Sequence, residues 1–151
     1  MFVKDYEYGF QCYVPDDFSE IKKENYESWN VVEGTLHHFV ILDDDGEVYK
    51  AFSINLLDPA ETQEDFENVV KKNVEDMKDF DLEILEEGEL KLPNDKVVKR
   101  VLTYDEEFDI HYVTYFLHIK NNVICSTISV GDEYDEEETI VATVYSSMEE
   151  I

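Results

Sequence analysis

The 151-residue chain has few of the residues that carry covalent, redox or phosphate chemistry. Its two cysteines are Cys12 and Cys125, and Arg100 is its one arginine. Two cysteines do not make a disulfide framework, and each lies in an apolar, strand-like stretch that favours a small buried side chain. Sites that clamp phosphates or carboxylates usually use more than one arginine. The sequence also lacks a Gly-rich phosphate loop, a Gly-x-Ser-x-Gly nucleophile turn and a Cys-x-x-Cys pair, so we expect no enzyme and no cofactor.

Basic residues and long apolar runs are scarce as well. Lysine and arginine together number 12 against 38 acidic residues, which gives a formal net charge of −26 at pH 7. Such a surface repels phosphate backbones and anionic lipids, so it predicts no nucleic-acid binding, and it attracts basic partners. No apolar run approaches the roughly 18 residues of a membrane span. The N-terminal residues lack the basic and apolar regions of a secretory signal, so we expect a cytoplasmic protein.

What the chain does have is a length and an aromatic content suited to one packed core. Its 151 residues are close to the commonest domain size, and we predict a single domain over residues 1–151. Ten tyrosines and nine phenylalanines supply large side chains that favour sheets and packed faces.

Three successive stretches predict the centre of a sheet: residues 97–104, 112–119 and 123–130. They are rich in Val, Ile, Thr, Tyr and Phe, which suit a pleated and half-buried surface. Short polar turns connect them, so we expect antiparallel pairing. Further strands are predicted at residues 6–14, 37–42, 48–57 and 81–92, the last with a kink allowed at Gly88. Asp45-Gly46 predicts a hairpin turn.

Two amphipathic helices are predicted, at residues 62–79 and 133–151. The first has Thr62 as its N-cap, with Asp65 three residues later in a variant of the capping box. The second follows a break and a cap at Gly131-Asp132 and starts with an acidic turn that suits the helix dipole, although its many β-branched residues lower its helix propensity. The fold class is therefore predicted to be α+β: a mostly antiparallel sheet of about six or seven strands covered by two amphipathic helices.

The order of these elements resembles the PsbP/DcrB-like superfamily. The resemblance rests on an opening Tyr-Gly-Phe…Val-Pro strand, a hairpin before a capped helix, the Gly-bearing strand Glu87-Gly88-Glu89, a long meander and a terminal helix. It implies a PsbP/DcrB-like sandwich. Members include photosystem accessory subunits, a nuclear-transport factor that binds the GTPase Ran, bacterial lipoproteins, and adaptor chaperones of type VI secretion effectors. The resemblance implies a sheet that presents surfaces to proteins, and it assigns no functional residue to this chain.

The four histidines are the candidate catalytic residues. His37 and His38 are neighbours on a predicted strand, so their side chains point to opposite faces, and the spacing of His111 and His118 has the same consequence. Cys125 and His118 lie on neighbouring predicted strands, but catalysis by such a pair needs a third group to orient the base. The alternative function is therefore a small hydrolase or ligand-binding domain that uses His111, His118 or Cys125 in a pocket against the sheet.

Acidic clusters at residues 43–47 and 132–138 concentrate oxygen ligands of the kind that calcium binds. Neither cluster has the EF-hand spacing. The first is explained as a hairpin turn and the second as a helix start. No metal site is predicted.

Aromatic residues of the central strands are the candidate binding residues. They are Tyr104, Tyr112, Tyr115 and Phe116. A sheet covered by only two helices can leave part of one face bare, and an aromatic patch rimmed by acids suits a basic or apolar peptide. The other reading is that these rings belong to the core. The sequence thus predicts a non-enzymatic protein-binding module of the adaptor, chaperone-like or immunity type, and it leaves the partner and the oligomeric state open.

Overall fold

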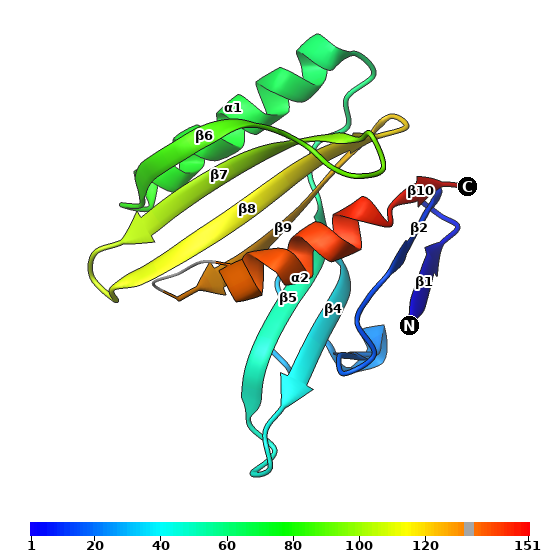
Figure 1. Cartoon of the computed structure of the whole chain (residues 1–151), viewed down its shortest axis with the longest axis vertical. Helices are drawn as coiled ribbons and strands as arrows, with labels where there is room; N and C mark the ends of the chain where they lie inside the picture. Colours follow the sequence, from blue (N-terminus) through cyan, green and yellow to red (C-terminus); the bar gives the residue numbers. More distant parts are fainter. Residues whose placement is uncertain (132–134) are drawn as a thin grey trace.

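The computed structural model describes residues 1–131 and 135–151. Within these residues it contains a seven-stranded sheet, a three-stranded sheet and two α-helices (Figure 1). In chain order the elements are β1 (Phe2–Asp5), β2 (Phe10–Tyr13), β3 (Ser19–Glu20), the short 3₁₀ helix η1 (Lys23–Asn25), β4 (Thr35–Leu42), β5 (Val48–Leu56), α1 (Gln63–Asp79), β6 (Glu83–Lys91), β7 (Val97–Asp105), β8 (Ile110–Ile119), β9 (Asn122–Val130), α2 (Asp135–Ser146) and β10 (Glu149–Glu150). The helix start predicted at Glu133 and its cap at Asp132 lie outside the described residues.

The larger sheet has the strand order β3-β4-β5-β9-β8-β7-β6, and each neighbouring pair is antiparallel. Thr114 of β8 lies opposite Val101 of β7 and Thr127 of β9, which fixes the register of the central meander. Short polar turns fold the chain back twice here, as the sequence predicts. The β4–β5 hairpin joins the meander through β9, and the α+β fold class is confirmed.

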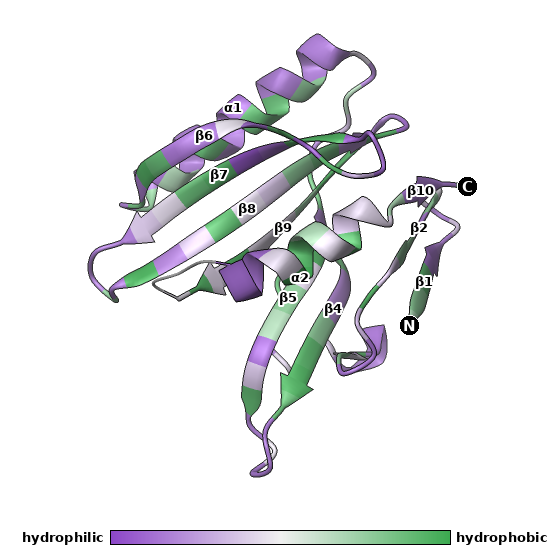
Figure 2. Cartoon of the chain, in the orientation of Figure 1, coloured by the Kyte–Doolittle hydropathy of each residue, from purple (hydrophilic) through white to green (hydrophobic). Residues whose placement is uncertain are grey.

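Helix α1 covers one face of the sheet. Its apolar stripe, formed by Phe66, Val70 and Val74, packs on the side chains of Val101 and Phe116. The predicted capping box is confirmed by two hydrogen bonds: the Thr62 hydroxyl accepts from the Asp65 N–H at 3.1 Å, and the Asp65 carboxylate accepts from the Thr62 N–H at 3.3 Å. Apolar and polar residues alternate along α1 (Figure 2), which is the pattern of a helix that turns one face toward a core.

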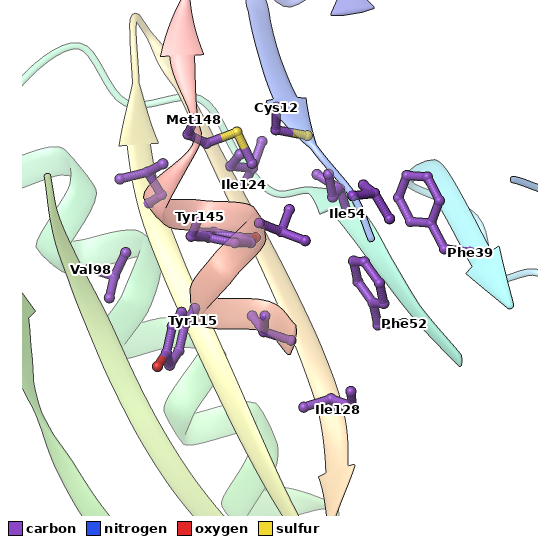
Figure 3. Close-up of a cluster of buried hydrophobic side chains, with 14 of the residues drawn as sticks. Cys12, Phe39, Phe52, Ile54, Val98, Tyr115, Ile124, Ile128, Tyr145 and Met148 are labelled. Atoms are coloured by element: carbon purple, nitrogen blue, oxygen red, sulfur yellow. The ribbon is translucent and has the colours of Figure 1, made fainter. Parts of the chain in front are cut away.

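Helix α2 and the small sheet β1-β2-β10 close the opposite face of the larger sheet over the main core (Figure 3). Tyr145 of α2 is fully buried there, with its ring edge-on to Tyr115 of β8. Each large apolar side chain in this core stabilises the fold by about 1.5–3 kcal/mol. The Tyr145 hydroxyl is 2.8 Å from the Ser126 hydroxyl, so both buried groups have a hydrogen-bond partner.

The predicted first strand at residues 6–14 is wrong in its first half. A turn separates β1 from β2, and in this turn the Gly9 N–H donates to the Asp5 carbonyl at 2.8 Å and the Tyr8 N–H donates to the Asp5 carboxylate at 2.9 Å. Gly9 has φ +75, which glycine adopts at little cost. The turn interrupts the strand before the alternating residues Phe10 and Cys12, which are buried as expected.

The prediction that the last helix continues to residue 151 is also wrong. Helix α2 ends at Ser146, and Glu149–Glu150 forms β10, which pairs with β2. Two acids at the C-terminal end of a helix would oppose its dipole. In the extended form the Glu149 carboxylate instead accepts a hydrogen bond from the Gln11 amide at 2.9 Å, and Met148 is fully buried.

The strand predicted at residues 81–92 forms β6, and its irregularity differs from the predicted one. The register shift lies between Ile84 and Glu86. Gly88 itself pairs regularly with Arg100, so no kink occurs at the glycine.

Candidate functional site

The four aromatic residues predicted to bind a partner do not form one surface. Tyr115 and Phe116 are successive residues of β8, so Tyr115 points into the α2 core and Phe116 into the α1 core. Both are buried and belong to the core, which is the other reading that the sequence allows for these rings. Tyr104 and Tyr112 are partly exposed. The Tyr104 hydroxyl donates to Asp109 at 2.8 Å, and a partner contact at these two tyrosines stays a prediction.

A groove of about 540 Å³ lies between α1 and strands β6 and β7, on the α1 side of the sheet. Its apolar lining comes from α1 and from the strands beneath it: Phe66, Val70, Val97, Val98 and Leu117. Val97 is 47% exposed at the start of β7, whereas Phe66 and Val70 are buried. The groove therefore offers an accessible apolar surface that the described part of the chain leaves uncovered.

His118 is the one of these candidate catalytic residues that lines the groove among the described residues. A carbonyl oxygen only accepts hydrogen bonds, so His118 Nε2 carries the proton that it donates to the Ala60 carbonyl at 2.8 Å. The imidazole is stacked on the Phe66 ring, with the centroids 5.4 Å apart and the planes 5° from parallel. These two contacts hold His118 as a fixed part of the lining. His111 points to the other face of the sheet, as its spacing predicts, beside Tyr104.

Cys12 and Cys125 are buried free thiols, as the sequence predicts. Burial raises the pKa of each thiol to about 12, and the charge of Glu20 adds to the effect at Cys12. The nucleophilic form of cysteine is the thiolate, and a pKa this high leaves almost none of it at neutral pH. Cys125 packs in the α1 core and is not among the residues that line the groove.

Charged residues surround the groove in equal numbers. The lysines are Lys71, Lys96 and Lys99, and the acids are Glu67, Glu87 and Glu89. Within residues 1–131 and 135–151, none of these three lysines forms an ion pair. They come from α1, the β6–β7 turn and β7, so a quarter of the chain's 12 basic residues gathers here only when the chain is folded. Sequence reasoning missed the groove for that reason.

On the other face of β6 and β7, Arg100 joins the sheet to α2. Its guanidinium donates to both oxygens of Glu138 at 2.7 Å and to Glu86 at 2.7 Å. The Tyr115 hydroxyl donates to Glu138 at 2.7 Å. Burial opposes ionisation of Glu138, but the hydrogen bonds from Arg100 and Tyr115 outweigh it and lower the pKa of this carboxyl.

A second charge cluster, in which Asp5 and His37 are buried and Glu20 is exposed, joins the small sheet to the large one. His37 Nε2 lies 2.8 Å from the Asp5 carboxylate, and Nδ1 lies 3.0 Å from the Glu20 carboxylate. Only an imidazolium donates from both ring nitrogens at once. Burial lowers the pKa of His37, yet the hydrogen bonds to Glu20 and Asp5 outweigh it, and the net shift is upward. His37 therefore lies between two carboxylates that favour its protonated form, and it connects β1, β3 and β4.

Among the described residues, no group of three His, Cys, Asp or Glu side chains is placed to hold a metal ion. The helices found there are also too short or too polar to span a bilayer. The acidic turn at residues 43–47 is a hairpin, in which Asp43 accepts from the N–H groups of Asp45 and Glu47 at 2.9 Å each.

An antiparallel sheet with a helix on each face and a small terminal sheet is a PsbP-like architecture. The solution structure of cyanobacterial PsbP (CyanoP) from Synechocystis sp. PCC 6803 matches 100% of this chain and 92% of its own, with a TM-score of 0.67 and 13% sequence identity. A crystal structure from Bacteroides thetaiotaomicron VPI-5482 matches 94% of this chain with a TM-score of 0.57 and 14% identity, and this chain spans 45% of that longer one. No family model and no curated protein matches the sequence. The resemblance predicted from element order is confirmed for the fold.

Proposed function

We propose that this chain is a non-enzymatic protein-binding module of the adaptor, chaperone-like or immunity type, which takes up a basic or apolar segment of another protein. The observation that carries the proposal is the groove of about 540 Å³ between α1 and strands β6 and β7. It exposes apolar side chains at one edge of a molecule whose net charge is −26. Exposed apolar surface with a polar rim is typical of an interaction site.

The environments of the candidate catalytic residues favour a binding function over catalysis. His118 donates from Nε2 to Ala60 and keeps the Nδ1 lone pair, so it could act only as a base with a nucleophile within reach. A nucleophilic cysteine needs an accessible thiolate, whereas burial raises the pKa of Cys125 to about 12. The cluster of Asp5, Glu20 and His37 links three strands, and its Asp5 and His37 are buried.

The acidic surface gives the proposed partner its charge. An excess of 38 acids over 12 bases attracts cationic segments from a distance and accelerates encounter, most strongly at low ionic strength. The apolar groove then provides the short-range contact, because burying apolar area contributes about 25 cal/mol per Å². The proposal therefore requires binding that is sensitive both to salt and to the polarity of the groove. We place this partner in the cytoplasm together with the chain.

Affinity capture with two matched variants tests this proposal. Val97→Asp puts a charge in the groove, and Val48→Asp is its control, because Val48 is also a half-exposed valine at the start of a strand (51% against 47% exposed). We expect a reproducible, salt-sensitive partner that is recovered by the wild-type chain and by Val48→Asp but lost by Val97→Asp. Failure to recover any such partner contradicts the proposal.

The second candidate is a ligand-binding domain, which the size and the lysines of the same groove favour. Pockets for small molecules usually measure about 300–1,000 Å³. Lys71, Lys96 and Lys99 would select an anionic amphiphile, with its apolar part against Val97. Native mass spectrometry of the purified chain separates the two candidates: a stoichiometric small anion released by Lys99→Glu supports the ligand, and a bare chain supports the protein partner.

A further inference from the structure

We propose that the outer edge of β6 takes up an extended, basic segment of the partner as an additional antiparallel or parallel strand. This inference rests on the proposed protein-binding function and specifies where and how a partner binds. Among the described residues, β6 hydrogen-bonds to β7 alone and is the last strand of the seven-stranded sheet. An edge strand presents unpaired N–H and C=O groups that another chain can pair with.

The two edges of the large sheet differ in length and accessibility. The edge at β3 has 2 residues, whereas β6 has 9, which is long enough for a continuous ladder of hydrogen bonds. Seven of the nine positions of β6 are exposed, with Leu85 and Leu90 among them. The longer edge is therefore the one that can add a strand.

Gly88, in the middle of β6, has no explanation within the chain. Its φ is outside the left-handed range, its pairing with Arg100 is regular, and a Cβ built on it meets no atom within 4 Å. Neither backbone conformation nor packing therefore requires glycine here, although glycine weakens a strand interior. Glycine at such a position is typical where another backbone or a ligand approaches closely. The missing side chain leaves room for a residue of an added strand.

Hollows lie on both faces of β6, one on each side of this glycine. On the α1 side, Glu87 and Glu89 line the groove described above. On the α2 side, Gly88, Glu86, Arg100 and Glu138 are among the residues that line a hollow of about 460 Å³. Successive side chains of an added strand point alternately to the two faces of the sheet. They would therefore enter the groove and this hollow in turn.

The negative charge of β6 favours a basic segment as the strand that binds at its edge. Four of the nine β6 residues are glutamates, against one lysine, Lys91. Antiparallel pairing of two copies of β6 would place glutamates beside glutamates, which is unfavourable. A basic segment is favoured, and the residue opposite Gly88 can extend a Lys or Arg side chain across the glycine. It would meet the carboxylates of Glu86 and Glu138. These two groups carry two negative charges against the single positive charge of Arg100.

A fluorescent nine-residue peptide of alternating lysine and threonine is the probe, and its length equals that of β6. The control peptide has the same sequence with alternate amides N-methylated, which keeps the charge and blocks one edge of the ladder. We expect the unmodified peptide to bind the intact chain more tightly by at least about tenfold in fluorescence anisotropy. Equal affinity of the two peptides, or no binding up to roughly 1 mM, overturns the inference.

Gly88→Val is the decisive variant. A Cβ at this position meets no atom within 4 Å, and valine has the higher strand propensity, so we expect an unchanged or higher Tm together with a loss of peptide affinity of at least about tenfold. Thr127→Val, at an exposed position of the central strand β9, is the control and keeps wild-type affinity. Wild-type affinity in Gly88→Val overturns the inference, as does a dimer of the wild-type chain in sedimentation that this variant abolishes.

Charge reversal and partner capture separate this inference from the proposed function. We expect the double variant Glu87→Lys/Glu89→Lys to lose peptide binding and the control Asp44→Lys/Glu47→Lys, at the distant β4–β5 turn, to keep most of it. Equal losses contradict a site at β6. If a captured partner depends on Val97 but is retained by Gly88→Val, the edge inference fails and the protein-binding function stands. If no partner is captured, the function fails.

Discussion

Arg100 of β7 and Glu138 of α2 meet through two hydrogen bonds of 2.7 Å each, with both side chains about 20% exposed. The pair connects the first turns of α2 to the strand next to the sheet edge. The Tyr115 hydroxyl donates to the same carboxylate, so its charge is matched on two sides. This contact sets one wall of the hollow beside Gly88.

Removal of Arg100 should therefore destabilise the fold strongly. Arg100→Met leaves the largely buried Glu138 carboxylate without its cation, which costs about 3 kcal/mol in the free energy of unfolding. The measurement is urea denaturation of both chains. Lys91→Met is the control, because Lys91 and Asp95 form an exposed pair, and such pairs contribute about 0–1 kcal/mol. Equal losses in the two variants would show that Arg100 and Glu138 form no specific pair.

Protonation of His37 should stabilise the fold at low pH, and this contribution should fall as pH rises. Hydrogen bonds to Glu20 and Asp5 raise the pKa of His37 above the ordinary value of 6.5 that the unfolded chain retains. The folded state thus holds the proton more tightly, and its contribution to stability is complete below that value and lost as pH rises through the folded pKa. We expect the stability advantage of the wild-type chain over His37→Gln to shrink above pH 6.5.

Denaturation of both chains across this pH range checks the prediction. His38→Gln is the control, because His38 neighbours His37 on β4 but is only partly buried, and burial lowers its pKa. An advantage that grows with rising pH would show that His37 is buried in its neutral form.

Both thiols should be inert in the folded chain. Burial raises the pKa of Cys12 and Cys125 to about 12, so neither offers thiolate to an alkylating reagent at neutral pH. We expect no labelling by iodoacetamide under native conditions and complete labelling of both in denaturant, read by mass spectrometry. Rapid labelling of Cys125 in the folded chain would show an accessible thiolate and would support Cys125 as a nucleophile.

Met148 tests the corrected C-terminal segment. It is fully buried between α2 and β10, so Met148→Ala should lower the free energy of unfolding by about 3 kcal/mol. Met77→Ala in α1 is the control, since Met77 is only partly buried and its truncation should cost less. A negligible loss at Met148 would indicate that residues beyond Ser146 do not pack on the core.

The sequence predicts the elements whose signals are local. Thr62 and Asp65 define the start of α1 by hydrogen bonds within one turn, and the three strands of the meander follow one another with short connections. In the structure Tyr115 and Phe116, as successive strand residues, point to opposite faces of the sheet. What alternation does not give is which face stays open, and both rings turn out to be core.

The errors lie where a distant residue decides. The last residues form β10 because Gln11, 138 positions away, pairs with Glu149, and no pattern within residues 133–151 contains that contact. The groove likewise depends on topology, since Lys71 and Lys99 belong to different elements that meet across α1 and β7. The sequence shows the glycine at position 88. It does not show that the space around this glycine is empty, because that depends on the place of β6 at the edge of the sheet.

Amide hydrogen exchange of the chain with and without the lysine–threonine peptide tests the proposed docking site most directly. We predict slowed exchange in β6, Glu83–Lys91, because the added strand would accept hydrogen bonds from its outward N–H groups. Exchange in the distant β4–β5 turn should not change. Unchanged exchange in β6 while the peptide is bound, or protection confined to another surface, would contradict a partner that docks at this edge.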